Sequence, residues 1–286
     1  MRRDPEEATR KAEQWLAQNG YNSLPIDPFA IAKSLDIEVR AKNDASPGVS
    51  GMLLRHGNNF GILFTTHIAS EGFQRFSVAH ELGHYLLDGH PEALFPNGNG
   101  AHASKAGFVS ADVYEREADH FASGLLMPGY LFKEALRYED EGLEAIEALA
   151  DKCKTSITAT AIRYANLTTM PAAVIMSTGG RVDWAFLSKE LRDFPDIAWP
   201  RKGEPLPLGV PTANFVRSEE NIRLARRVRE EVELRDWLGG RAGITANEEV
   251  LGLGAYGKTL TVLTTDSLDE DEDIDLEEQW TPRFRR

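Results

Sequence analysis

The chain has 286 residues and a formal net charge of −13 at pH 7, from 45 acidic and 32 basic residues. This length accommodates one large or two ordinary domains with an ample core, and the acidic charge argues against direct nucleic-acid binding, because phosphate contacts require a basic face. The single cysteine, Cys153, excludes an intrachain disulfide framework and fits a reducing, cytoplasmic compartment.

The N-terminal part of the chain reads as helices followed by strands. Asp4 as N-cap and Pro5 at the first helical position predict a helix over residues 5–18, without the apolar segment of a signal peptide. The patterns then predict a helix over 28–35 and strands near 37–41, 50–55 and 60–65. No apolar run approaches membrane-spanning length, so we expect no membrane partner.

The most informative stretch is the pentapeptide HELGH at residues 80–84. Apolar residues recur around it at helical spacing and predict a helix over about 77–88, with Ser77 as N-cap and Gly89 after its end. Histidines at i and i+4 lie on one helical face, so His80 and His84 can reach a single metal ion. Zinc accepts neutral imidazole ligands and activates water, and Glu81 would serve as the general base.

The third ligand has two candidates. His90 has the spacing of the metzincin motif HExxHxxGxxH, but Leu87 stands where that motif needs glycine. The other candidate is Glu117, on a predicted helix over about 112–126 whose apolar stripe would pack on the first helix. In gluzincins the third metal ligand is a glutamate from a second helix, and the dense apolar residues around Glu117 favour this residue. Tyr114 and His120, three residues either side of Glu117, are candidate donors to the tetrahedral oxyanion.

Together these motifs resemble the ImmA/IrrE family of zinc metallopeptidases. The resemblance rests on AHELGHYLL at residues 79–87 and on the pattern EAxxFAxxLLMP at residues 117–128, and it extends over about residues 20–168. It implies a zincin-like fold in which His80, His84 and Glu117 bind zinc, with manganese as an alternative metal. It also implies a substrate class, the helix-turn-helix (XRE-type) transcriptional repressors. The segment from 88 to 111 looks longer than is usual in the family and is rich in Gly, Asn, Ala and His.

Three shorter helices are expected after the second motif, near 130–138, 143–153 and 157–165. The last two, joined by a tight polar link, have the pattern of a helix-turn-helix. Their basic residues are few, so packing or repressor docking is favoured over DNA reading.

The sequence pattern changes from helical spacing to strand and turn signals after residue 168. Strands at 172–176 and 182–187 flank the turn signal Thr178-Gly179-Gly180-Arg181, and a second hairpin is predicted at 248–253 and 258–263. A charged helix is predicted between them, over residues 218–238. Residues 267–286 begin with a block of acidic residues and are expected to form a flexible tail.

The sequence therefore predicts an α+β protein with three parts. Residues 1–168 would form a zincin-like helical metallopeptidase core with a small mixed sheet. Residues 169–266 would form an α+β accessory domain with an antiparallel sheet, and 267–286 the acidic tail. The predicted function is a zinc endopeptidase that cleaves a helix-turn-helix repressor and thereby relieves repression during stress or mobile-element induction. The alternative is a non-enzymatic metal-containing regulator, such as one component of a toxin–antitoxin pair, and the intact Glu81 favours the enzyme.

Overall fold

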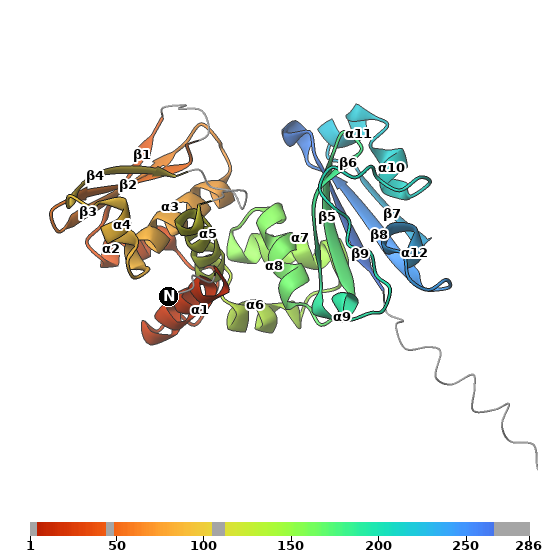
Figure 1. Ribbon diagram of the computed structural model, residues 1–286, viewed down its shortest axis with the longest axis horizontal. Helices are drawn as coiled ribbons and strands as arrows, with labels where there is room; N and C mark the ends of the chain where they lie inside the picture. Colours follow the sequence, from red (N-terminus) through yellow and green to blue (C-terminus); the bar gives the residue numbers. More distant parts are fainter. Residues whose placement is uncertain (1–4, 44–48, 105–111, 266–286) are drawn as a thin grey trace, which may run out of the picture. The chain divides into compact units, whose positions relative to one another are not determined.

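The computed structural model describes residues 5–43, 49–104 and 112–265. The chain divides into two compact units. Unit 1 comprises residues 1–140 and 144–163, and unit 2 comprises residues 141–143 and 164–286 (Figure 1). The α+β class predicted from the sequence is confirmed, because each unit combines helices with one sheet. No helix in the described part of the chain has the length and apolar character needed to cross a membrane.

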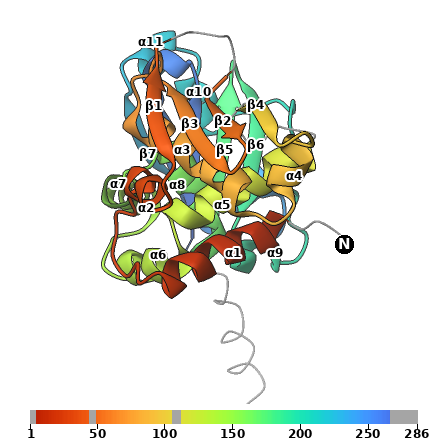
Figure 2. The same ribbon diagram turned by 90° about the vertical axis from the view of Figure 1, so that its left-hand side faces the viewer.

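The sheet of unit 1 is mixed and has the strand order β1-β3-β2-β4 (Figure 2). The β1 and β3 strands are parallel, whereas β2 runs antiparallel to both β3 and β4. Gly57, in the left-handed region at φ 59°, forms the tight turn between β2 and β3. The strands are β1 (Glu38–Lys42), β2 (Gly51–His56), β3 (Asn59–Thr65) and β4 (Asn99–Ser104).

Helices α1 to α6 belong to unit 1, and the long helix α3 packs against both the sheet and α5. The α3 helix begins earlier than the sequence predicted, because Ser70 rather than Ser77 caps it and accepts a hydrogen bond from the Phe73 amide. The six helices are α1 (Pro5–Gln18), α2 (Pro28–Ser34), α3 (Glu71–Leu86), α4 (His90–Leu94), α5 (Val113–Leu126) and α6 (Gly129–Leu136).

The predicted pair of helices near 143–153 and 157–165 is present as α7 (Gly142–Cys153) and α8 (Ile157–Leu167). Both span the division between the units, since residues 141–143 and those from Tyr164 onward belong to unit 2. Within unit 1, the α8 residue Arg163 donates to the Met127 carbonyl at 2.9 Å and to the Glu13 carboxylate at 2.6 Å. This basic residue of the suspected helix-turn-helix is thus buried against unit 1.

Unit 2 contains an antiparallel sheet of order β6-β5-β9-β8-β7, and both predicted hairpins are confirmed in it. Its buried core gathers apolar residues of the strands and of the short helices α9 (Lys189–Arg192), α10 (Pro211–Phe215), α11 (Glu219–Arg223) and α12 (Leu234–Leu238). The strands are β5 (Ala172–Thr178), β6 (Arg181–Leu187), β7 (Arg227–Glu233), β8 (Thr245–Gly252) and β9 (Thr259–Thr264).

The prediction of one long charged helix over residues 218–238 is wrong. Ala225 adopts a left-handed conformation at φ 50° directly after α11, and the chain then forms strand β7 and the short helix α12. Pairing with β8 overrides the helix propensity of the charged residues, because Val228 lies opposite Val250 and Val232 opposite Ala246. The Asp4 cap and the acidic tail at 267–286 lie outside the described residues.

Candidate metal centre

The two motif histidines share one face of α3, as the sequence predicted. Their side chains are buried, and the Nε2 atoms of His80 and His84 lie 3.1 Å apart. Gly83, between them, lets α5 approach closely, since a Cβ atom at this position would lie 3.2 Å from the Ala118 Cα. Gly83 therefore permits close contact between α3 and the middle of α5.

Glu115, near the start of α5, completes the cluster. Its Oε1 atom lies 3.2 Å from the His84 Nε2, and its Oε2 atom lies 3.5 Å from the His80 Nε2. One ligand atom from each of His80, His84 and Glu115 lies within 4.8 Å of the others, which makes these three buried residues a group able to hold a metal ion. Glu115 was not predicted from the sequence, although Asp119 four residues later on the same helical face was an available signal.

Glu117, the glutamate favoured from the sequence, is not brought into this cluster. Its Oε2 atom lies 3.0 Å from the His90 Nε2, and the His90 Nδ1 lies 3.1 Å from the His84 Nδ1. The reason is helical phase, because residues two apart on a helix are rotated by about 200° around its axis. His90 likewise presents its nitrogens to His84 and Glu117 and does not join the grouped ligand atoms.

Further polar groups hold the cluster in place. The His80 Nδ1 lies 2.8 Å from the Asp119 Oδ1, and the His102 Nε2 lies 2.8 Å from the Glu115 Oε1. His102 comes from β4, in the segment whose composition gave no element from the sequence. A carboxylate on the outer nitrogen of a histidine fixes the ring and leaves the other nitrogen free to bind a metal.

The chemistry of this donor set fits a cation. With Nδ1 donating to Asp119, a neutral His80 directs its Nε2 lone pair toward the His84 Nε2 and the Glu115 carboxylate. Burial lowers the pKa of His84 to about 3. Burial also lowers the pKa of His80, but hydrogen bonds to Asp119 and Glu115 outweigh it and raise that pKa to about 10. The site therefore attracts positive charge, which a metal ion would supply in place of the proton on His80.

The general-base candidate Glu81 lies beside this cluster and is fully buried. Burial raises the pKa of Glu81 to about 7, although the nearby charge of His80 and the Ser104 hydroxyl act to lower it. Neither of its carboxylate oxygens has a hydrogen bond of normal geometry. A buried carboxylate without a full set of partners indicates a group held ready for chemistry.

Comparison with known proteins gives a family for the part of the chain that contains this cluster. Residues 32–164 match the model of a peptidase family described as the IrrE N-terminal-like domain, Peptidase_M78. This part of the chain is an IrrE N-terminal-like domain. Its boundaries include His80, His84 and Glu115, which form the candidate metal centre, and the neighbouring Glu81.

The fold as a whole is similar to a solved structure titled a Mycobacterium tuberculosis transcriptional regulator. The match has 17% sequence identity and a TM-score of 0.54, and it covers 91% of this chain and 76% of that chain. At this identity the likeness concerns the fold. A search of curated proteins gave no match.

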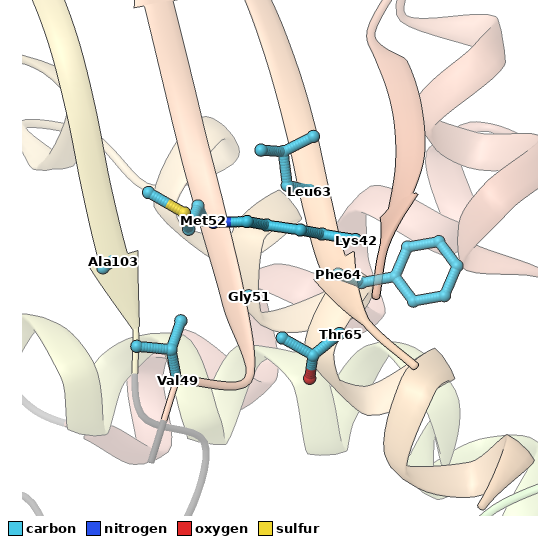
Figure 3. A pocket seen from close by; sticks show the side chains of 8 residues that line it. All are labelled: Lys42, Val49, Gly51, Met52, Leu63, Phe64, Thr65 and Ala103. Atoms are coloured by element: carbon cyan, nitrogen blue, oxygen red, sulfur yellow. The ribbon is translucent and has the colours of Figure 1, made fainter. Parts of the chain in front are cut away.

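A pocket of about 200 Å³ lies over the sheet of the IrrE N-terminal-like domain (Figure 3). Its lining includes Met52, Leu63 and Ala103, which are partners in the β3-β2-β4 register, together with Lys42 from β1. Gly51 also lines the pocket and packs against Glu81, because a Cβ at residue 51 would lie 2.6 Å from the Glu81 Oε1.

The two predicted oxyanion donors lie on the same helix as Glu115. Tyr114 has its ring against the His90 imidazole, with centroids 5.0 Å apart. The His120 backbone carbonyl accepts a hydrogen bond from the Thr9 hydroxyl at 3.1 Å. Donation by either side chain to an oxyanion stays a prediction.

Proposed function

We propose that this protein is a zinc-dependent endopeptidase whose metal is held by His80, His84 and Glu115. The observation that carries the proposal is the convergence of the two Nε2 atoms and one carboxylate within 4.8 Å in a peptidase-family domain. Two imidazoles and one carboxylate are a catalytic zinc set that leaves a position open, and manganese is an alternative because one ligand is a carboxylate.

Zinc bound here would polarise the scissile carbonyl and make water more acidic. Glu81 would take a proton from the attacking water at its carboxylate and return it to the nitrogen of the leaving amine. Burial raises the pKa of Glu81, which strengthens this carboxylate as a base. Gly51 leaves the space that this carboxylate occupies, because a Cβ at residue 51 would lie 2.6 Å from the Glu81 Oε1.

The outer residues would keep the ligands aligned. Asp119 accepts the Nδ1 proton of His80, and His102 donates its Nε2 proton to Glu115. Burial acts to raise the pKa of Glu115, but the hydrogen bond from His102 and the contacts with His80 and His84 hold that pKa well below its usual range. Glu115 therefore stays an ionised ligand at neutral pH.

The proposed substrate is a cytoplasmic helix-turn-helix transcriptional repressor of the XRE type. Two observations support this class. Members of the matched family act on proteins, and the chain carries a net charge of −13. A strongly acidic protein favours a basic partner, and the DNA-reading face of a repressor is basic.

Unit 2 would supply recognition and not chemistry. Among its described residues, the most buried carboxylate, Glu248, is fully engaged in the core. It accepts hydrogen bonds from the Thr212 amide and hydroxyl and from the Trp237 indole, each at 2.6 Å. A unit that adds surface without reactive groups most plainly serves to bind the substrate protein or a signal.

The decisive experiment incubates the zinc-loaded wild-type chain and Glu81→Gln with a candidate repressor, the product of the neighbouring gene, and scores cleavage. Wild type should cut the repressor into defined fragments, whereas Glu81→Gln should retain zinc and lose cleavage by roughly 10²–10⁴-fold. Glu92→Gln, on the exposed side of α4, is the matched control and should cleave normally. Full biological activity of Glu81→Gln in cells would identify a partner-binding regulator and refute the peptidase.

A further inference from the structure

Behind the His80–His84–Glu115 cluster lies a second row of polar groups that the proposed reaction does not use. The row runs from the His84 Nδ1 to the His90 Nδ1 at 3.1 Å, and from the His90 Nε2 to the Glu117 Oε2 at 3.0 Å. All three side chains are buried, with His84 and His90 at most 1% exposed and Glu117 8% exposed. Burying two imidazoles and a carboxylate is costly, which calls for a reason beyond packing.

The ring nitrogens that carry protons in His90 and His84 can be assigned by starting from the Glu117 carboxylate. A carboxylate accepts only, so the His90 Nε2 carries the proton that is donated to Glu117. The Nδ1 of a neutral His90 is then an acceptor, and the His84 Nδ1 must carry the proton between the two rings. His84 is thereby left with its lone pair on Nε2, the atom that faces His80 and Glu115.

The fold builds this row with a specific turn. Gly89 adopts the left-handed conformation at φ 78°, which glycine tolerates best, and the His90 amide donates back to the Leu87 carbonyl at 3.1 Å. The turn makes His90 the first residue of α4 and returns its ring to α3. The Tyr114 ring packs edge-on against that imidazole, with centroids 5.0 Å apart and planes at 78°.

We propose that His90 and Glu117 are positioning residues for the metal, which fix the tautomer and ring orientation of the ligand His84. Asp119 contacts the outer nitrogen of His80 directly. Glu117 would have the same effect on His84, but through the imidazole of His90, which lies between them. This inference rests on the proposed function, since it assigns the residues a role toward the same metal. Outer partners of this kind change metal affinity by about 10–100-fold.

The test measures zinc affinity of the full chain by competition with a chromophoric chelator. His90→Phe keeps a ring but removes both nitrogens, and it should weaken zinc binding by about 10–100-fold. His90→Asn offers an amide oxygen near the lost Nδ1 and should recover part of the affinity. His67→Phe, at an exposed position before α3, is the matched control and should bind zinc like wild type.

A double-mutant comparison tests whether Glu117 acts on the metal only through His90 or independently of it. Because Glu117 acts through His90, the pair His90→Phe with Glu117→Ala should bind zinc no more weakly than His90→Phe alone. Glu117→Ala alone should lose more affinity than Glu117→Gln, whose amide oxygen still accepts from His90. Should His90→Phe fail to fold, the two Glu117 variants decide the question, and wild-type affinity of Glu117→Ala overturns the proposal.

Imidazole nitrogen NMR of the zinc-loaded protein adds a readout that simple packing would not change. In wild type, His84 should show a protonated Nδ1 and His90 a protonated Nε2, and Glu117→Ala should release His90 into a mixture of tautomers. Wild-type zinc affinity of a folded His90→Phe overturns this inference and leaves the peptidase proposal intact. Failure of the wild-type chain to bind zinc overturns both.

Discussion

Glu115 and Glu117 lie two residues apart on α5, yet their carboxylates contact different histidines. The Glu115 Oε1 lies 3.2 Å from the His84 Nε2, whereas the Glu117 Oε2 lies 3.0 Å from the His90 Nε2. His84 is therefore held between one carboxylate at its inner nitrogen and one imidazole–carboxylate pair at its outer nitrogen. This arrangement separates a glutamate that can bind a metal from one that can orient a ligand.

The first prediction uses this separation. Glu115→Ala should lower zinc affinity by more than about 100-fold, beyond the range of an outer partner, because it removes a ligand. Glu117→Ala should lower it by about 10–100-fold. The measurement is chelator competition with metal analysis of the dialysed protein, and Glu92→Ala serves as an exposed control. A site emptied by Glu117→Ala but not by Glu115→Ala would restore Glu117 as the third ligand.

The second prediction concerns the support of the general base. Gly51→Ala places a methyl group 2.6 Å from the Glu81 Oε1, so the carboxylate must move. We expect peptide cleavage to fall by about tenfold or more with zinc content unchanged, since small displacements of a reacting group are costly. Gly61→Ala on the adjacent strand is the control, because its new Cβ meets nothing closer than 3.6 Å. Equal activity of the two variants would contradict the role given to Gly51.

The third prediction is a pH dependence of stability. Burial raises the pKa of the Cys153 thiol from 9.0 to about 12, against the nearby charges of Lys152 and Arg163. The folded state holds this proton more tightly, so its contribution to stability is full below pH 9 and is lost as the pH rises toward 12. Between about pH 7 and pH 10, wild type should lose about 1.4 kcal/mol more unfolding free energy than Cys153→Ala.

Denaturant titrations of the two proteins at both pH values measure this difference, and all other titrating groups cancel between them. The same burial should protect the native thiol from iodoacetamide at about pH 8 until denaturant unfolds the chain. Rapid alkylation of the native protein would show that Cys153 is more accessible than its burial indicates.

Much of the fold was predictable because its local signals and tertiary contacts agree. The HELGH helix, the β2 and β3 strands and both hairpins of unit 2 follow from apolar periodicity and glycine turns. The failures have a common cause in tertiary pairing. Strand β7 carries charged residues that favour a helix, but its two valines pair with β8. The β4 sequence has the pattern of a polar loop because its side chains are small, and only its pairing with β2 makes it a strand.

The residues of the candidate site likewise divide into those that local spacing predicts and those that depend on tertiary contacts. The i, i+4 spacing predicts that His80 and His84 share one helical face, and their Nε2 atoms lie 3.1 Å apart in the structure. The apolar stripe does not distinguish Glu115 from Glu117, because both are buried on α5 and only their contacts differ, Glu115 with His80 and His84 and Glu117 with His90. His102 was not predictable, since its role depends on the pairing of His102 with Leu53 in the sheet.

The last prediction tests whether charge steers the substrate. A net charge of −13 should attract a basic repressor over a distance of about 10 Å at 0.1 M salt, and over about 3 Å at 1 M salt. Cleavage of the repressor under kcat/KM conditions should therefore fall by about tenfold or more between roughly 0.05 and 0.5 M NaCl, salt concentrations chosen to span this screening range. A short uncharged peptide cut at the same sequence supplies the control, because it reaches the same metal centre without long-range attraction. An equal fall for both substrates would assign the salt effect to the active site, and an unchanged rate for the repressor would show that surface charge plays no part in its capture.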